Sequence, residues 1–131
     1  MKILVVDDEP EGGRVVRLLL EACGAKVTEA SDAKVGFEAL LSSPPDVLIS
    51  DIGMPDEDGY SFIRRIRELG LEKGGGNPAI ALTAYARTED RMRSIINCFQ
   101  MHLSKPVESA EFLTMVASLT NRTSLLGAKP A

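Results

Sequence analysis

The chain has 131 residues, 44% of them hydrophobic and 26% charged, and it carries a net charge of -4 with a pI near 5.0. This composition is typical of one globular domain and excludes a disordered chain. The acidic balance gives no support for binding nucleic acid or a membrane, and no apolar run approaches the roughly 20 residues that span a bilayer. We therefore expect a cytoplasmic domain. Cys23 and Cys98 lie in helical patterns without a CxxC motif, so neither a disulfide nor a metal site is predicted for them.

The apolar pattern alternates five times between strand and helix. Short apolar or alternating runs predict strands at residues 3–6, 26–30, 47–49, 79–83 and 101–104. Apolar residues at helical spacing predict helices at residues 11–23, 33–41, 60–69, 89–96 and 110–119. The apolar positions of the first include Val15 and Val16, and those of the second include Leu40 and Leu41. Gly24 should end the first helix, and Ser31 or Asp32 should cap the second. Thr88 and Ser109 should cap the last two.

Strands that alternate with helices, without an internal repeat, indicate a parallel sheet with right-handed crossovers and helices on both faces. The fold class is therefore a doubly wound α/β domain with a five-stranded sheet. We expect this domain to cover residues 1–120 and residues 121–131 to form a polar C-terminal tail. The glycine-rich segment 72–78 should be a surface loop.

Polar side chains stand where the predicted strands end. They are Asp7 and Asp8 after the first strand, Asp51 after the third, Thr83 after the fourth and Lys105 after the fifth. In a parallel sheet these ends meet along one edge, which is where ligands bind. Asp51 could also be a simple turn residue, because Pro55 and Gly59 follow it. The convergence of three carboxylates favours a functional site instead.

Three carboxylates held close together repel one another, so a cation is expected among them. Carboxylate oxygens suit Mg²⁺, which binds one or two protein carboxylates together with phosphate oxygens. A carboxylate can also attack phosphorus and form an aspartyl phosphate, and Mg²⁺ and Lys105 would offset the charge of the transferred group. The residues therefore predict phosphoryl chemistry, with Thr83 able to hydrogen-bond a phosphoryl oxygen.

Five separated positions carry a resemblance to a known family. They are Asp7-Asp8, Asp51, Thr83-Ala84 and Lys105-Pro106, together with the turn Asp51-x-x-Met54-Pro55-x-x-x-Gly59. Over about residues 2–119 the chain resembles the receiver domain of two-component response regulators. The resemblance implies a flavodoxin-like sheet with strand order 2-1-3-4-5.

The resemblance also implies a role for each of these residues. Asp51 would be the phosphoacceptor, and Asp7, Asp8 and Asp51 would bind Mg²⁺ with the backbone carbonyl of Gly53. Thr83 would be the switch hydroxyl. Lys105 would pair with the phosphoryl group and would precede Pro106 through a cis peptide bond.

The chain departs from the family pattern at four positions. The residue three positions before the lysine is His102 instead of Tyr or Phe, so a switch movement coupled to Thr83 would be altered or pH-sensitive, or His102 would have no switching role. Gly53 offers no side chain to position an attacking water and Tyr85 is bulky, so we expect no strong side-chain assistance to self-dephosphorylation. Cys98 replaces a helix-ending glycine, which predicts a strained or differently terminated helix end.

Three alternatives share this architecture. A Mg²⁺-dependent aspartyl phosphatase of the haloacid dehalogenase type needs a second acid two residues after the nucleophile, where Gly53 stands. A flavodoxin-like FMN protein needs a phosphate-binding loop after the first strand, where Asp7 and Asp8 would repel a phosphate. A pseudo-receiver would bind partners without being phosphorylated.

The sequence thus predicts a phosphoryl-accepting switch that is not a turnover enzyme. Its partner would be a histidine kinase or a histidine phosphotransfer protein. The run from Gln100 to Glu108 is more similar to receivers of hybrid histidine kinases than to a stand-alone receiver, and both origins stay open. We expect a monomer or a weak, phosphorylation-dependent dimer.

Overall fold

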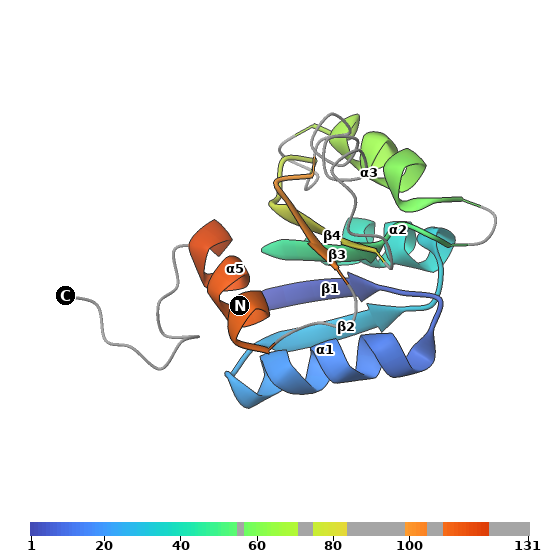
Figure 1. The fold of residues 1–131 in the computed structure, drawn as a ribbon. Helices are drawn as coiled ribbons and strands as arrows, with labels where there is room; N and C mark the ends of the chain where they lie inside the picture. Colours follow the sequence, from blue (N-terminus) through green and yellow to red (C-terminus); the bar gives the residue numbers. More distant parts are fainter. Residues whose placement is uncertain (55–56, 71–74, 84–98, 105–108, 121–131) are drawn as a thin grey trace.

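The structure is a computed structural model, and it describes residues 1–54, 57–70, 75–83, 99–104 and 109–120. The strands are β1 (Lys2–Val6), β2 (Lys26–Ala30), β3 (Val47–Asp51), β4 (Ala79–Thr83) and β5 (Met101–Ser104). The helices of the described part are α1 (Pro10–Ala22), α2 (Ala33–Ser42), α3 (Gly59–Arg67) and α5 (Ser109–Thr120). All strand pairs are parallel and the order is β2-β1-β3-β4-β5 (Figure 1). The predicted doubly wound α/β fold is confirmed.

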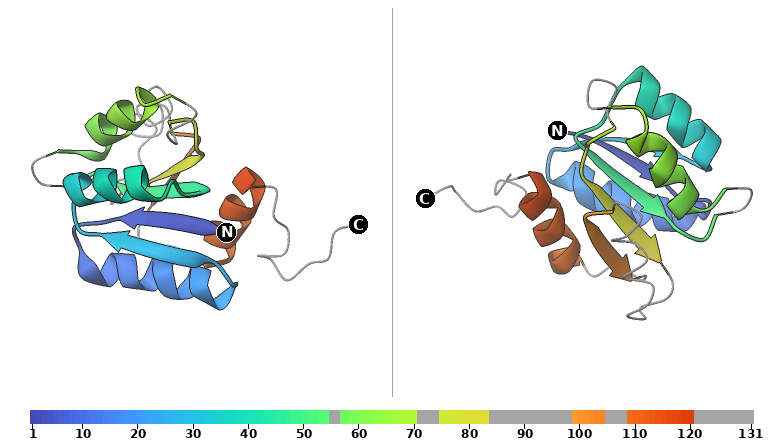
Figure 2. Two further views of the ribbon diagram at one scale, coloured as in Figure 1. Left: turned by 180° about the vertical axis from the view of Figure 1, so that it is seen from behind. Right: turned by 90° about the horizontal axis from the view of Figure 1, so that it is seen from above.

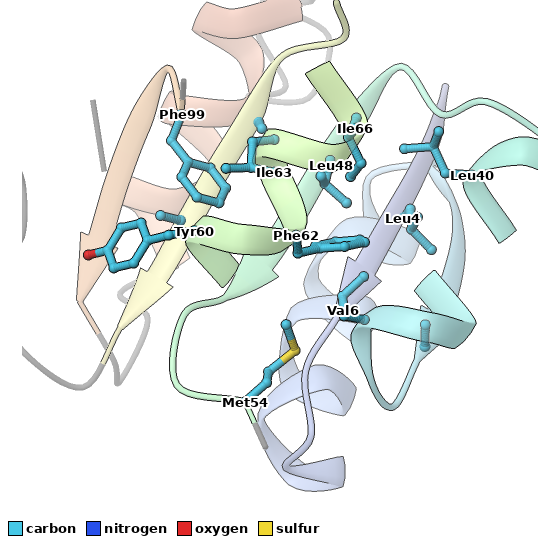
Figure 3. Packing of buried hydrophobic residues seen from close by; sticks show 14 residues of the cluster. Leu4, Val6, Leu40, Leu48, Met54, Tyr60, Phe62, Ile63, Ile66 and Phe99 are labelled. Carbon is cyan, nitrogen blue, oxygen red and sulfur yellow. The ribbon is translucent and has the colours of Figure 1, made fainter. Parts of the chain in front are cut away.

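The helices divide between the two faces of the sheet, α1 and α5 on one and α2 and α3 on the other (Figure 2). The cluster under α1 and α5 includes Ile3, Val5, Val16, Leu20, Ile49, Ile80, Leu82, Phe112 and Val116. The cluster under α2 and α3 includes Leu4, Val6, Leu40, Leu48, Met54, Phe62, Ile63, Ile66 and Phe99 (Figure 3). Each fully buried aliphatic or aromatic side chain of this kind contributes about 1.5–3 kcal/mol, so these two layers are the main source of stability.

The central strand β3 lies between β1 and β4, and all five of its residues are buried. Val47 and Ile49 enter one cluster and Leu48 enters the other, which explains why this run is apolar without alternation. The outer strand β2 is mostly exposed, in keeping with its alternating sequence. A strand buried on both faces is a rigid support for the residue at its end, which is Asp51.

Helix ends follow the expected chemistry with small shifts. Gly24 has a positive φ of 88° just after α1, and the Oδ1 atom of Asp32 accepts a hydrogen bond from the backbone N–H of Val35 at 2.8 Å. Asp32, and not Ser31, therefore caps α2. α3 ends at Arg67, two residues earlier than predicted. Ser109 is the first residue of α5 instead of the cap before it, and residue 108 is outside the described part.

Two residues expected on apolar faces are exposed. Val15 is 52% exposed and Leu41 is 47% exposed, whereas their neighbours Val16 and Leu40 are buried. Consecutive helical residues point about 100° apart, so only one member of each pair faces the sheet. The predicted helix at 89–96 and Cys98 lie outside the described residues. No helix within the described ranges is both long enough and apolar enough to cross a membrane.

Candidate functional site

The candidate site lies at the carboxyl ends of the neighbouring strands β1 and β3. Val6 of β1 is in register with Ser50 of β3, so the residues that follow, Asp7 and Asp51, are neighbours at the same edge. Asp8 comes directly after Asp7. This is the edge at which the sequence predicts a site.

The three carboxylates converge. One carboxylate oxygen from each of Asp7, Asp8 and Asp51 lies within 4.8 Å of the other two. Asp7 and Asp51 are each only 5% exposed, and Asp8 is partly exposed. Octahedral Mg²⁺ with bonds of about 2.1 Å holds oxygens roughly 2.9–4.2 Å apart, which is close to the spread of these atoms. The donor set therefore fits a hard divalent cation.

The backbone fixes both buried aspartates. The N–H of Asp7 donates to the carbonyl of Ala30 at 3.0 Å, and its Oδ1 accepts from the N–H of Glu9 at 2.9 Å. Beyond Asp51, the N–H of Ile52 donates to the carbonyl of Leu82 at 2.9 Å. These bonds extend the ladders of the sheet past the strand ends, so both carboxylates stand on rigid backbone.

Asp51 has two further local contacts. Its Oδ1 accepts a long hydrogen bond from the N–H of Gly53 at 3.3 Å. The buried hydroxyl of Ser50 donates to the backbone carbonyl of Asp51 at 3.0 Å. The Ser50 contact was not predicted, although a serine inside an otherwise apolar central strand is a signal that could have indicated it.

The turn after Asp51 is closed by backbone hydrogen bonds. The carbonyl of Ile52 accepts two of them, from the N–H of Met54 at 3.0 Å and from the N–H of Gly59 at 2.9 Å. The side chain of Met54 is only 7% exposed and points into the cluster around Val6 (Figure 3). The turn is thus anchored near its start by a buried side chain and at its end by the first residue of α3.

Two glycines of this turn have opposite surroundings. A Cβ atom at Gly59 would lie 2.5 Å from the backbone oxygen of Asp51 and 2.9 Å from the Cα of Ile52. A Cβ atom at Gly53 would have no heavy atom within 4 Å. Gly59 is therefore required by packing, whereas position 53 has room for a side chain.

A hollow of about 350 Å³ lies beside Asp7, between α1, the end of β2 and the start of α2. Arg17 lines it and forms ion pairs with Glu29 at 2.8 Å and Glu21 at 3.0 Å. Because two glutamates take up the charge of this guanidinium, it does little to offset the acidic cluster.

The remaining predicted site residues are described only in part. Thr83 ends β4 next to Asp51, since Asp51 is in register with Leu82, and Thr83 is in register with Ser104 of β5. The side chains of Thr83 and His102 are outside the described part of the structure, as are Lys105 and Pro106. The roles predicted for these four residues stay predictions.

Comparisons with known proteins agree with this geometry. Residues 3–117 match the family described as the response regulator receiver domain. An uncharacterized 14.6 kDa protein of Leptolyngbya boryana is 47% identical over 116 residues, which cover 88% of this chain and 87% of that protein. The transcriptional regulatory protein DltR of Streptococcus agalactiae is 34% identical, over 98% of this chain and 55% of its own length. The sensor histidine kinase RcsC of Escherichia coli is 37% identical, over 82% of this chain and 11% of its own length.

Solved structures show the same fold. The receiver domain of the sensor histidine kinase PA1611 from Pseudomonas aeruginosa, with a magnesium ion in its active site cleft, superposes with a TM-score of 0.82 at 31% identity, covering 92% of this chain and 97% of that one. A response regulator receiver domain protein from Clostridium thermocellum superposes with a TM-score of 0.81 at 28% identity, covering 95% and 98% of the two chains.

Proposed function

Because the chain belongs to the response regulator receiver domain family, we propose that it accepts a phosphoryl group on Asp51 and thereby changes its contacts with other proteins. The observation that carries this proposal is the convergence of Asp7, Asp8 and Asp51 within 4.8 Å at the carboxyl edge of the sheet. A buried carboxylate on a rigid strand, beside two further oxygen donors, suits an in-line attack on phosphorus.

The chemical step is a transfer from phosphohistidine. A carboxylate oxygen of Asp51 forms a bond to phosphorus while the phosphorus–nitrogen bond breaks, and the electron pair of that bond goes to the imidazole of the donor. The products are an aspartyl phosphate on this chain and a free histidine on its partner. The protein is altered once and then reset by hydrolysis, so it acts as a switch and not as a turnover enzyme.

Asp7, Asp8 and Asp51 would hold Mg²⁺, together with the backbone carbonyl of Gly53. When bound, Mg²⁺ would neutralise charge on the phosphoryl oxygens during the transfer. The magnesium ion in the PA1611 receiver domain supports this assignment by similarity. The protein's own part is to hold its carboxylates close together before the donor arrives.

The other roles follow the resemblance. Lys105, held by a cis bond to Pro106, would pair with the phosphoryl group, and Thr83 would hydrogen-bond one of its oxygens. That hydrogen bond would shift the chain between two conformational populations. His102 stands at the position whose side chain would move together with the switch hydroxyl. We place this receiver domain at residues 1–120, followed by a polar tail at 121–131.

The partner would be a histidine kinase or a histidine phosphotransfer protein in the cytoplasm. The chain spans most of the Leptolyngbya relative, about half of DltR and about a tenth of RcsC, so the matched relatives include both short and long proteins. A receiver of a hybrid kinase and a stand-alone receiver both fit this pattern. We expect the domain to be a monomer, or a weak dimer once phosphorylated.

The test is intact mass spectrometry after adding acetyl phosphate and Mg²⁺ to the wild type and to Asp51→Asn. We expect the wild type to gain one phosphoryl group, a chelator to abolish the gain, and the variant to gain none. If the folded wild type gains nothing in the presence of Mg²⁺, the chain is a pseudo-receiver and the proposal fails.

A further inference from the structure

We propose that Arg65 is a positioning residue that holds the turn after Asp51 and thereby sets the affinity of the site for Mg²⁺. The inference rests on the proposed function, because it concerns the same metal site. Three described side chains carry it, Glu57 in the turn, Arg65 on α3 and Phe37 on α2, and we call this set the turn clamp.

The first part of the turn clamp is a bidentate ion pair. The Nε atom of Arg65 donates to Oε2 of Glu57 at 2.8 Å, and its second guanidinium nitrogen donates to Oε1 at 2.7 Å. The two side chains are 43% and 23% exposed. Many surface ion pairs contribute little, but two parallel short bonds fix direction as well as distance. Glu57 is therefore held in one orientation.

The second part is a cation–π contact. The guanidinium carbon of Arg65 lies 4.4 Å from the centre of the Phe37 ring. Phe37 is itself partly buried against the core cluster under α2 and α3. The planar guanidinium is thus fixed by its edge against Glu57 and by its face against Phe37, which leaves it little freedom to rotate.

The turn clamp adds a fixed point at Glu57, between Met54 and Gly59, where the turn is already held at its two ends. Gly59 closes the turn through its bond to Ile52 at 2.9 Å, and Asp58 caps α3 by accepting from the N–H of Ser61 at 2.8 Å. Nearer the site, the N–H of Gly53 donates a long hydrogen bond of 3.3 Å to Oδ1 of Asp51. A side chain that ties Glu57 to α3 therefore limits the positions open to the turn.

The consequence concerns the carbonyl of Gly53, which the proposed function makes a metal ligand. Ordering a loose ligand costs conformational entropy, so a turn that is already fixed binds the metal more tightly. Loss of a group that supports a metal ligand directly weakens metal binding about 10–100-fold; Arg65 acts through several residues, so about three- to tenfold is expected.

The experiment is calorimetric titration of the folded protein with Mg²⁺, well below its melting temperature. Arg65→Ala and the isosteric Glu57→Gln should each raise the Kd for Mg²⁺ by about three- to tenfold. The Kd of Arg65→Lys should lie between those values and the wild-type Kd, because lysine keeps the charge but cannot form the bidentate ion pair. Arg64→Ala is the matched control, since it removes the same charge from the same helix, and its Kd should stay within about twofold of the wild type.

Two further readouts separate positioning from general destabilisation. The rate of phosphorylation by acetyl phosphate at saturating Mg²⁺ should be close to that of the wild type in Arg65→Ala, while the Mg²⁺ concentration for half the maximal rate rises. The double variant Glu57→Gln/Arg65→Ala should bind Mg²⁺ no more weakly than either single variant, because both remove one interaction.

The outcomes are distinct. Unchanged Mg²⁺ affinity in both single variants, or fully additive losses in the double variant, would overturn the role of the turn clamp and leave the proposed function intact. A wild type that binds no Mg²⁺ would overturn both. If Arg65→Ala does not fold, the comparison of Glu57→Gln with the wild type decides.

Discussion

Replacing Gly59 by alanine inserts one methyl group directly behind the proposed phosphoacceptor. The new Cβ would lie 2.5 Å from the backbone oxygen of Asp51 and 2.9 Å from the Cα of Ile52. Favourable contacts between such atoms lie near 3.5 Å, so the overlap with the oxygen is about 1 Å. Both neighbours are backbone atoms, and β3 is buried on both faces. The strain cannot be relieved by rotating a side chain.

The expected loss of stability follows from two opposing terms. Overpacking at a rigid site costs about 1–3 kcal/mol. Alanine gains up to about 1 kcal/mol over glycine from helix propensity, because position 59 begins α3. The net effect should be a loss of about 1–2 kcal/mol in the free energy of unfolding, with the turn after Asp51 displaced.

Urea denaturation followed by circular dichroism, without Mg²⁺, measures this loss. With a slope of about 2 kcal/mol/M, the midpoint of Gly59→Ala should fall by roughly 0.5–1 M. Gly53→Ala is the control, because its Cβ meets nothing within 4 Å, and its stability should stay within about 0.5 kcal/mol of the wild type or rise. Equal midpoints for Gly59→Ala and the wild type would refute the reasoning.

Three other changes test the site. Gly53→Asn places a side chain in the open space at position 53. If the missing side chain limits hydrolysis, the lifetime of the phosphoryl group, measured by intact mass, should fall at least about threefold. An unchanged lifetime would show that position 53 is not limiting. Mg²⁺ at 100 times its Kd should raise the free energy of unfolding by about 2.7 kcal/mol in the wild type. Without Mg²⁺, Asp8→Asn should be more stable than the wild type in urea denaturation, because one like charge is gone. It should also lose most of the stabilisation that Mg²⁺ gives the wild type, and an equal stabilisation would remove Asp8 from the proposed metal site. Ser50→Ala removes the hydrogen bond to the carbonyl of Asp51 and should cost about 1 kcal/mol in urea titrations, whereas no loss would mean that this bond is energetically neutral.

Most of the fold could be predicted from the sequence, because the strands and helices differ sharply in the period of their apolar residues. The run from Val47 to Ile49 is apolar without alternation, which is typical of a strand buried on both faces. The choice between Ser31 and Asp32 as a cap could not be made, since both residue types cap helices and adjacent positions differ only in backbone geometry. The exposure of Val15 and Leu41 could not be predicted, because two adjacent apolar residues do not reveal which one faces the sheet.

The acidic part of the site was also predictable, since Asp7 and Asp51 follow strands that must be neighbours or near neighbours in a parallel sheet. The structure confirms that these carboxylates and Asp8 converge. The pairing of Glu57 with Arg65 could not be read from the sequence, because it depends on how the turn folds back over α3. Ser50 was a missed signal: a hydroxyl in a fully buried strand needs a partner, and Ser50 donates to the backbone carbonyl of Asp51.

The proposal that Asp51 accepts the phosphoryl group is best tested by identifying the residue that carries this group. The variant Asp51→Asn is less direct, because it alters the proposed metal site as well as the nucleophile. The protein is treated with acetyl phosphate and Mg²⁺ and then with borohydride, which reduces an aspartyl phosphate to homoserine, and its peptides are sequenced by mass spectrometry. We expect homoserine at position 51 and unmodified aspartate at positions 7 and 8. Homoserine at either of those positions, or a phosphate that survives borohydride on a hydroxyl such as that of Thr83, would contradict it.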